Sequence, residues 1–381
     1  MGVRTMRPAW WQSLLRRWDP FLLLFLAGFF TFSHWVMTSA SPERLDEQWL
    51  HQGLALTAFL VAALVPFRWW LAVSPLLFLG GVIALVLVLV VGVTAKGATR
   101  WLDLGVVRVQ PSELMKLAVP LLCAAYFHWR QGVLRWWDHL VAFVWVLAPT
   151  ALILKQPDLG TAIMVGVIGG CVLFFAGLSW RLILPVVVAV SVAIAALLHY
   201  GDRWCAPEVE WPGLHDYQKG RICTLLDPER DPLGKGFHTI QAAIAIGSGG
   251  VWGKGLGNGT QSQLAFIPER HTDFILAVIA EELGFVGVAG LFAGYLILLF
   301  RGFSLALSSG LWSGQLFGCA AVTGIFLYTW VNAAMVMGLA PVVGVPLPFV
   351  SYGGTALVSL CLMLGVTASA AAEPLRGGGR R

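Results

Sequence analysis

Residues 70–95 read WLAVSPLLFLGGVIALVLVLVVGVTA, a run without a single ionisable side chain. An α-helix needs roughly 20 apolar residues to cross the hydrocarbon core of a bilayer, so this run is long enough to span it. The whole chain has this character, because 58% of its 381 residues are hydrophobic, only 12% are charged and the mean hydropathy is +0.77. Too few polar residues are present to cover a water-soluble globule. The sequence therefore predicts a polytopic membrane protein.

Further segments of this kind follow along the chain, the shorter ones extended by aromatic flanks. Long solid apolar runs favour helices, since strands of a transmembrane barrel alternate over about ten residues instead. We predict an all-α fold of about ten transmembrane helices, with residues 1–381 forming one membrane domain without internal repeats. The predicted spans are 20–40, 51–67, 70–95, 113–129, 139–154, 160–178, 182–200, 274–300, 312–338 and 353–372.

Basic residues set the predicted orientation, because Lys and Arg in short loops favour the cytoplasmic side. If the N-terminus is cytoplasmic, the arginines of the termini and short loops lie on the cytoplasmic side. The acidic residues on that side are Asp19, Asp138 and Glu373. Both termini are then cytoplasmic, and the large loop at about 201–273, between spans 7 and 8, is extracytoplasmic. The Trp and Arg residues of 129–139 are interpreted as anchors to anionic membrane lipids, and nothing indicates nucleic acid. The first apolar run lacks a clear cleavage site and is interpreted as a retained anchor.

Two of the six cysteines, Cys205 and Cys223, fall in the large outer loop. An oxidising compartment would allow them to form a disulfide closing a loop of about 18 residues. The sequence leaves this pairing open. The other four cysteines lie in predicted spans, where a thiol behaves as a small hydrophobic group.

Polar residues gather where the large loop meets the eighth predicted span, at IPERHTDFI (267–275). Asp273 is a carboxylate at the edge of a membrane helix, where charge is costly and indicates a functional site. One interpretation is helix capping, with Thr272 as N-cap and Asp273 in the first turn. The other is a general base at the rim of a cavity, whose pKa Arg270 and His271 would adjust.

Glu113 and Lys116, in QPSELMK, lie three residues apart on one face of the fourth predicted span. They form either a mutual ion pair that makes two costly charges tolerable, or part of a polar cavity where Lys116 meets a phosphate group. Asp158 in KQPDLG and Ser351 in PLPFVSYGG fall on the same outer side. The prolines and glycines of PLPFVSYGG break a regular helix. Irregular backbone within the membrane is tolerated only if it is buried or lines a cavity. We therefore expect one outward pocket suited to a lipid-linked, phosphate-bearing substrate.

Motifs of other enzyme classes are absent from the sequence. It contains no GxSxG, HExxH, CxxC or Walker sequence. The glycine-rich GKGLGNG at 253–259 lacks the spacing and the terminal GK[ST] of a phosphate-binding loop. We therefore expect no nucleotide site there.

A series of motifs, in order along nearly the whole chain, resembles the SEDS family of bacterial cell-wall polymerases. GTQSQL before IPERHTDF resembles the elongation members, the RodA type, more than the division members, the FtsW type. One segment, DRWCAPEVEWPG (202–213), is longer than the family pattern and carries a cysteine. The motifs are GATRWLDLG (97–105), QPSELMK (110–116), KQPDLGT (155–161), LLDPERDPLG (225–234), AIAIGSGG (243–250), GTQSQLAFIPERHTDFI (259–275), EELGFVG (281–287) and GVPLPFVSYGG (344–354).

This resemblance implies a peptidoglycan glycosyltransferase of the bacterial cytoplasmic (inner) membrane, which polymerises lipid II into glycan strands on the outer face during cell elongation. It implies that the family's essential aspartate is Asp273, that its cavity-lining acid and lysine are Glu113 and Lys116, and that Trp101 matches a tryptophan the family uses. An acceptor hydroxyl must lose its proton as it attacks the donor sugar with inversion, which suits Asp273 as general base. The implied partner is a class B penicillin-binding protein, a transpeptidase of the penicillin-binding protein 2 type, within the elongation machinery.

The charge that develops on the diphosphate leaving group needs a counter-charge. Lys116, Arg100, Arg270 or a divalent cation (Mg²⁺ or Mn²⁺) held by carboxylates would supply it. The sequence fixes neither a cofactor nor a metal ligand. Two other function classes stay open: a flippase of lipid-linked precursors, with charges near mid-bilayer between repeated broken helices, and a non-catalytic scaffold for a transpeptidase, in which Asp273 is dispensable.

Overall fold

The computed structural model describes residues 17–95, 98–103, 105, 108–131, 134–206, 209, 216–227, 235–264, 266, 267 and 269–373. Each predicted span coincides with a helix: α2 (Pro20–Ala40), α3 (Leu45–Leu64), α4 (Phe67–Val91), α5 (Pro111–Trp129), α6 (Trp136–Lys155), α7 (Leu159–Phe175), α8 (Trp180–Trp204), α12 (Ile275–Ser308), α13 (Trp312–Val336) and α14 (Gly354–Ala371). The other described helices are the 3₁₀ helix η1 (Pro42–Arg44), α9 (Asp216–Leu226), α10 (Lys235–Gly249) and α11 (Thr260–Gln263). Helices α9, α10 and α11 all belong to the segment predicted as the large outer loop.

Seven helices in the described part of the chain are long and apolar enough to cross a membrane, namely α2, α4, α6, α8, α12, α13 and α14. Helix α7 is apolar but shorter. Helix α3 carries Asp46 and Glu47 in its first turn, and α5 carries Glu113 and Lys116, which lowers the hydropathy of both. The chain is thus a multi-pass membrane protein.

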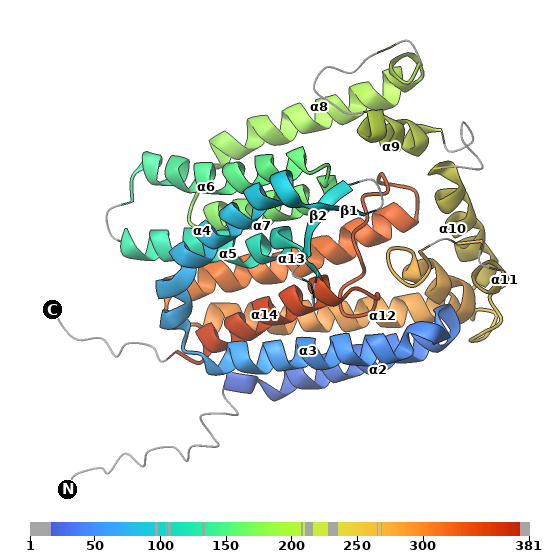
Figure 1. Cartoon of the computed structure of the whole chain (residues 1–381), viewed down its shortest axis with the longest axis horizontal. Helices are drawn as coiled ribbons and strands as arrows, with labels where there is room; N and C mark the ends of the chain where they lie inside the picture. The colour runs from blue at the N-terminus through green and yellow to red at the C-terminus, as the bar shows by residue number, and fades with distance from the viewer. Residues whose placement is uncertain are drawn as a thin grey trace, which may run out of the picture.

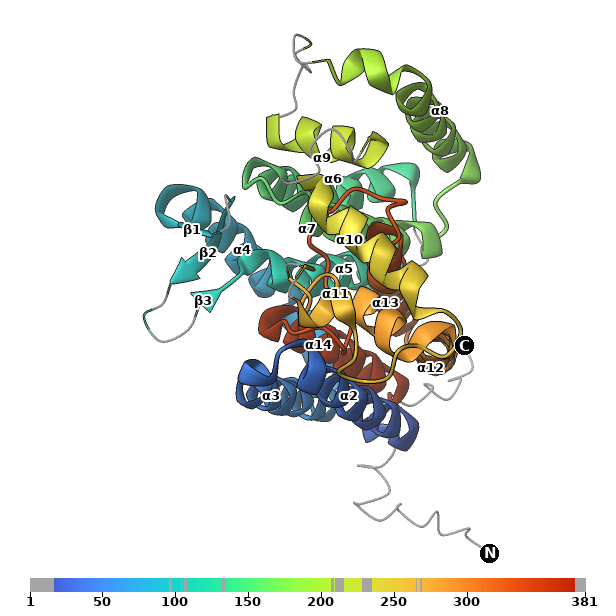
Figure 2. The same cartoon turned by 90° about the vertical axis from the view of Figure 1, so that its right-hand side faces the viewer.

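The all-α prediction needs one correction, at the segment between α4 and α5. Three short strands, β1 (Val93–Ala95), β2 (Ala98–Asp103) and β3 (Arg108–Val109), form an antiparallel sheet in the order β1-β2-β3 (Figures 1 and 2). Strands β1 and β3 have only three and two residues, and β2 (ATRWLD) does not alternate apolar with polar residues, so the pattern by which a half-buried strand is recognised is missing. The sheet matters for the site because β2 carries Trp101.

Helix α13 is central to the bundle and packs against α5, α7, α12 and α14 (Figure 1). Phe317, Ile325 and Tyr328 on α13 are almost completely buried, as expected for a helix surrounded by others. Helix α14 packs against α3, and α10 packs against α12. Helix α8 differs, because none of its membrane-spanning segment is buried and it stands away from the bundle (Figures 1 and 2).

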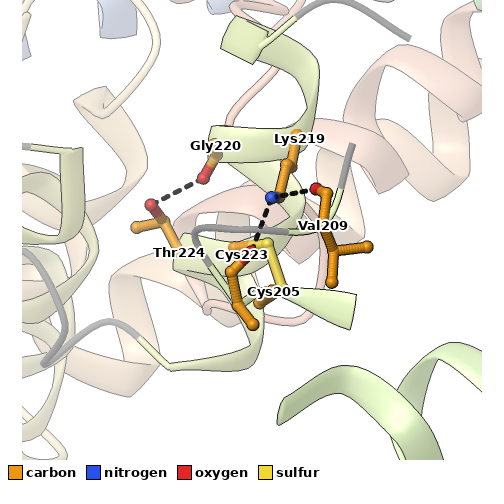
Figure 3. The surroundings of a disulfide bond; sticks show 7 residues. Cys205, Val209, Lys219, Gly220, Cys223 and Thr224 are labelled. Carbon is orange, nitrogen blue, oxygen red and sulfur yellow. Dashed lines mark hydrogen bonds between the residues drawn. A yellow bond between two sulfur atoms is a disulfide. The ribbon is translucent and has the colours of Figure 1, made fainter. Parts of the chain in front are cut away.

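A disulfide joins the end of α8 to α9, between Cys205 and Cys223, whose Cα atoms lie 5.6 Å apart (Figure 3). The Lys219 ammonium donates hydrogen bonds to the carbonyl oxygens of Ala206 (2.9 Å) and Val209 (2.6 Å) beside it. A cation favours the carbonyl groups at a helix C-terminus, so Lys219 reinforces the joint. The pairing that the sequence left open is thus formed in the structure.

We expect removal of this disulfide, by Cys205→Ser with Cys223→Ser, to lower stability by about 3 kcal/mol, because the cross-link closes a loop of 18 residues. The measurement is the thermal unfolding midpoint in detergent, with and without reductant. Reductant should lower the midpoint of the wild type and leave that of the double variant unchanged. A wild-type midpoint that is insensitive to complete reduction would show that the disulfide does not stabilise the joint.

Helix α12 is bent at Gly284, whose φ of 67° and ψ of −166° suit glycine. The bend frees backbone groups, which must be paired in a membrane protein. The glycine-rich 253–259 segment supplies partners, and the amide of Gly255 donates to the Glu282 carbonyl at 2.9 Å. This segment therefore has a structural role at the bend of α12.

Candidate functional site

Residues 269–274 form a turn directly before α12 and carry Asp273, whose side chain is half-buried. The turn is anchored from α13, where the Asn332 amide donates to the Asp273 carbonyl at 2.8 Å. It is anchored a second time from the loop before α14, where the Ser351 hydroxyl donates to the Thr272 carbonyl at 2.6 Å. Two separate segments thus hold the backbone on which the predicted general base stands.

The capping interpretation of this turn is wrong. Helix α12 begins at Ile275, with Phe274 as the N-cap residue, no capping side chain and no acidic residue in the first turn. Thr272 instead donates its hydroxyl to the Glu269 carboxylate at 2.9 Å. Asp273 therefore lies just before the helix rather than within its first turn.

Arg270 and His271 connect the turn to its surroundings. Arg270 donates a hydrogen bond to the Ser262 carbonyl in α11. The His271 ring lies edge-on to Tyr352, with centroids 5.7 Å apart, and the Tyr352 hydroxyl donates to the Glu47 carboxylate. Burial, together with the bond to Glu47, raises the pKa of the Tyr352 phenol. The phenol therefore stays protonated at neutral pH and keeps donating this bond.

A cavity of about 650 Å³ lies beside the turn, between α3, α5, α14 and the small sheet. Thr272, next to Asp273, lines it together with Trp101 and Glu113. Leu117 and Leu362 contribute to its apolar wall. A largely apolar cavity with a few polar groups is typical of a ligand site.

Glu113 and Lys116 form the ion pair that one of the two interpretations predicted. Lys116 is only 2% exposed, and its ammonium lies 2.5 Å from a Glu113 carboxylate oxygen and donates to the Tyr328 hydroxyl on α13. The second Glu113 oxygen accepts a hydrogen bond from Ser359 on α14 at 2.7 Å. Glu113 lines the cavity, whereas Lys116 lies behind it. Lys116 therefore stabilises the charge of Glu113 from within the bundle.

Asp158 is the N-cap of α7 and is only 3% exposed. Its carboxylate accepts hydrogen bonds from the Thr161 amide (3.2 Å) and the Gln110 side chain (3.0 Å). The Arg100 guanidinium lies 3.7 Å from the same carboxylate. Gln110 lines the cavity, so Asp158 contacts the cavity wall through Gln110.

We expect Asp158→Ala to lower stability by about 1–3 kcal/mol, because it removes a cap and leaves Arg100 and Gln110 without a buried partner. The thermal unfolding midpoint of the purified variant measures this. Asp158→Asn is the matched control, because its amide oxygen still accepts from the Thr161 amide, and it should lose less. An alanine variant as stable as the wild type would contradict this role.

Among the residues that the structure describes, no three His, Cys, Asp or Glu side chains lie together as a metal-binding group. Hard divalent cations bind through oxygen ligands and often take several from substrate phosphates. The divalent cation stays a prediction.

The sequence interpretation missed Asn332, Ser359 and Tyr328, which complete the surroundings of Asp273, Glu113 and Lys116. Asn332 is the clearest omission, because an amide within an apolar span is itself a signal of function. Ser359 and Tyr328 gave no such signal, since hydroxyl groups are common in membrane helices.

Comparison with known proteins decides the family. The profile of the FtsW, RodA and SpoVE proteins, described as "Cell cycle protein", matches residues 18–374. The chain belongs to this family. It is 45% identical over 354 residues to the peptidoglycan glycosyltransferase MrdB of Escherichia coli strain K12, covering 92% of each chain. It is 35% identical over 326 residues to the probable peptidoglycan glycosyltransferase FtsW of Geobacter metallireducens, covering 84% of this chain and 83% of that one.

Solved structures agree with this assignment to the FtsW and RodA family. One is a chain of a peptidoglycan synthase complex, whose structure is described as showing the coordination of polymerization and crosslinking. It superposes with a TM-score of 0.75 at 35% identity, covering 93% of this chain and 97% of that chain. The crystal structure of the rod shape determining protein RodA of Thermus thermophilus gives a TM-score of 0.68 at 29% identity, covering 93% and 96%. The SEDS resemblance is therefore confirmed, as is its closeness to RodA.

Proposed function

We propose that this protein is a peptidoglycan glycosyltransferase that polymerises lipid II during cell elongation. Its family and the names of its relatives support the glycosyltransferase class. The observation in the structure that carries the proposal is the half-buried Asp273 on an anchored turn, whose neighbour Thr272 lines a cavity of about 650 Å³. The turn that carries Asp273 thus borders a cavity of a kind that suits a lipid-linked substrate, which supports the proposal.

Asp273 is the proposed general base. The donor sugar is bonded to a diphosphate carried by a polyprenol, and the acceptor is a sugar hydroxyl. Asp273 takes the hydroxyl proton while the oxygen bonds to the anomeric carbon of the donor, and the bond to the diphosphate breaks with inversion.

Arg270 is the proposed counter-charge for the diphosphate among the cationic candidates. It lies on the same turn as Asp273. Arg100 and Lys116 are paired with the carboxylates of Asp158 and Glu113, whereas Arg270 donates its hydrogen bond to the neutral Ser262 carbonyl. A guanidinium matches phosphate geometry through paired N–H groups, which suits Arg270 to this role.

We also propose ten membrane spans, with both termini cytoplasmic, in one domain over residues 1–381 of the bacterial inner membrane. The one-to-one match of the predicted segments with helices supports the count. The arginines of the short loops support the orientation. The disulfide between Cys205 and Cys223 fits an extracytoplasmic outer loop, since disulfides persist in oxidising compartments.

The proposed partner is a class B penicillin-binding protein that cross-links the new strands. The similar chain of a solved peptidoglycan synthase complex, in which polymerization and crosslinking are coordinated, supports this partner. The cavity and the turn of Asp273 both belong to this chain. We therefore assign polymerisation to this chain and cross-linking to the partner.

The decisive experiment is incubation of the purified protein with lipid II, followed by gel separation of the glycan products. We expect long glycan strands without any other polymerase. A flippase would instead move lipid II across vesicles without joining it, and a scaffold would do neither. Failure of the folded protein and its transpeptidase complex to form strands would overturn the proposal.

A further inference from the structure

Asn332 is a fully buried amide in the central helix α13, and no step of the proposed reaction uses it. Its Nδ2 group donates two hydrogen bonds, each of 2.8 Å, to the carbonyl oxygens of Asp273 and Val345. A buried amide is costly within a membrane helix unless it is paired. The two bonds pair the NH₂ end of the amide, whereas its Oδ1 is buried without a hydrogen-bond partner among the described residues.

The two acceptors determine how the amide is oriented. If the amide were flipped, its Oδ1 would face the two carbonyl oxygens. A carbonyl oxygen cannot donate a hydrogen bond, so neither contact would form. Asn332 therefore bridges two segments of the chain, the turn at 269–274 and the loop between α13 and α14. Both are attached to the same point of the central helix α13.

The bridge sets the surroundings of the Asp273 carboxylate. Gly344, the residue before Val345, has a φ of +75°, and a Cβ atom built on it would lie 3.4 Å from Oδ2 of Asp273. The loop thus passes directly beside the carboxylate. Because Asn332 holds the carbonyls of Asp273 and Val345 by one amide group, it fixes the spacing between the carboxylate and this loop.

A second bridge joins the same two segments. The Ser351 hydroxyl donates to the Thr272 carbonyl at 2.6 Å and accepts a hydrogen bond from the Leu347 amide at 2.8 Å. A third bond joins them directly, from the Tyr352 amide to the His271 carbonyl at 2.8 Å. Asn332 differs from these contacts because its side chain ties the backbone of Asp273 itself to helix α13.

We propose that Asn332 is a positioning residue, which holds the Asp273 carboxylate at the spacing from the Gly344 loop that proton transfer requires. This inference rests on the proposed role of Asp273 as general base. Asn332 does not touch the substrate. Its loss should therefore slow the chemical step more than it weakens substrate binding.

The test compares Asn332→Ala with Thr329→Val in the full-length purified protein, using lipid II as substrate. Thr329 is the matched control, because it is a buried polar residue on the same helix that bonds only to the Ile325 carbonyl of its own helix. We expect Asn332→Ala to lower kcat by about 10- to 100-fold and to change KM by less than about threefold. We expect Thr329→Val to leave both within about twofold of the wild type.

The pH dependence of kcat separates positioning from loss of folded protein. Fewer folded molecules would scale the profile without moving it, whereas a displaced carboxylate moves its acid limb along the pH axis. If Asn332→Ala gives too little folded protein, Asn332→Gln is measured in its place, because it keeps the amide but displaces it by one methylene group. A kcat and a pH profile equal to those of the wild type would overturn this inference.

Asp273→Asn, measured in the same series, keeps the two proposals apart. Loss of polymerisation in Asp273→Asn with a normal Asn332→Ala would overturn the positioning role alone. Wild-type polymerisation by Asp273→Asn would overturn the general base and, with it, the positioning role. A reduced kcat and a shifted profile for Asn332→Ala, beside an inactive Asp273→Asn, would support both.

Discussion

Asp273→Asn should abolish glycan polymerisation, with an initial rate about 100- to 10,000-fold below that of the wild type. Asparagine has the same shape as aspartate but no basic oxygen, so it keeps the packing of the turn and removes the proton acceptor. The anchors from Asn332 and Ser351 bind backbone carbonyls and are unaffected by this change. The measurement is the initial rate of lipid II consumption by the purified protein.

The matched control for this prediction is Asp46→Asn. Asp46 is an exposed acid in the first turn of α3, away from the cavity lining. Its neutralisation should leave the rate within about twofold of the wild type, because surface substitutions rarely disturb a distant site. An equal loss of rate in both variants would mean that polymerisation responds to surface charge and not to Asp273.

Lys116→Met should be the most destabilising single change. Methionine fills a similar volume, but it leaves the Glu113 carboxylate buried with Ser359 as its remaining hydrogen-bond donor in the structure. Breaking a buried pair by removing one partner costs about 3–5 kcal/mol. We expect a clearly lower thermal unfolding midpoint and loss of polymerisation, measured on the same preparation.

The double variant Glu113→Gln with Lys116→Met separates charge burial from function. Removing both charges of a buried pair is often neutral, so the double variant should recover most of the lost stability. It should remain defective in polymerisation, because Glu113 lines the cavity. A single Lys116→Met variant as stable as the wild type would show that Lys116 and Glu113 do not form a buried ion pair.

The membrane helices could be predicted because the bilayer restricts the possible structures so strongly. Backbone groups in lipid must be paired within the segment, so an apolar run of about 20 residues has few alternatives to a helix. Residues 70–95 correspond in this way to α4, which ends at Val91. The start of α3 could not be predicted in this way. Its first turn carries Asp46 and Glu47 and precedes the apolar run from which the span was predicted.

Tertiary contacts account for what the sequence could not provide. The N-cap of α12 is Phe274, two residues beyond the predicted Thr272, and Thr272 bonds to Glu269 instead of capping the helix. The spacing of Glu113 and Lys116 predicted their contact but not that Glu113 alone faces the cavity. Asn332 acquires its role only when α13 lies beside the turn of Asp273, which no local pattern reveals.

The most direct measurement is lipid II polymerisation by the complex of Asp273→Asn with its transpeptidase partner, beside the wild-type complex. We expect the variant to co-purify with the partner as the wild type does and to form no glycan strands. Wild-type strand formation by this variant complex would contradict the assignment of Asp273 as the base.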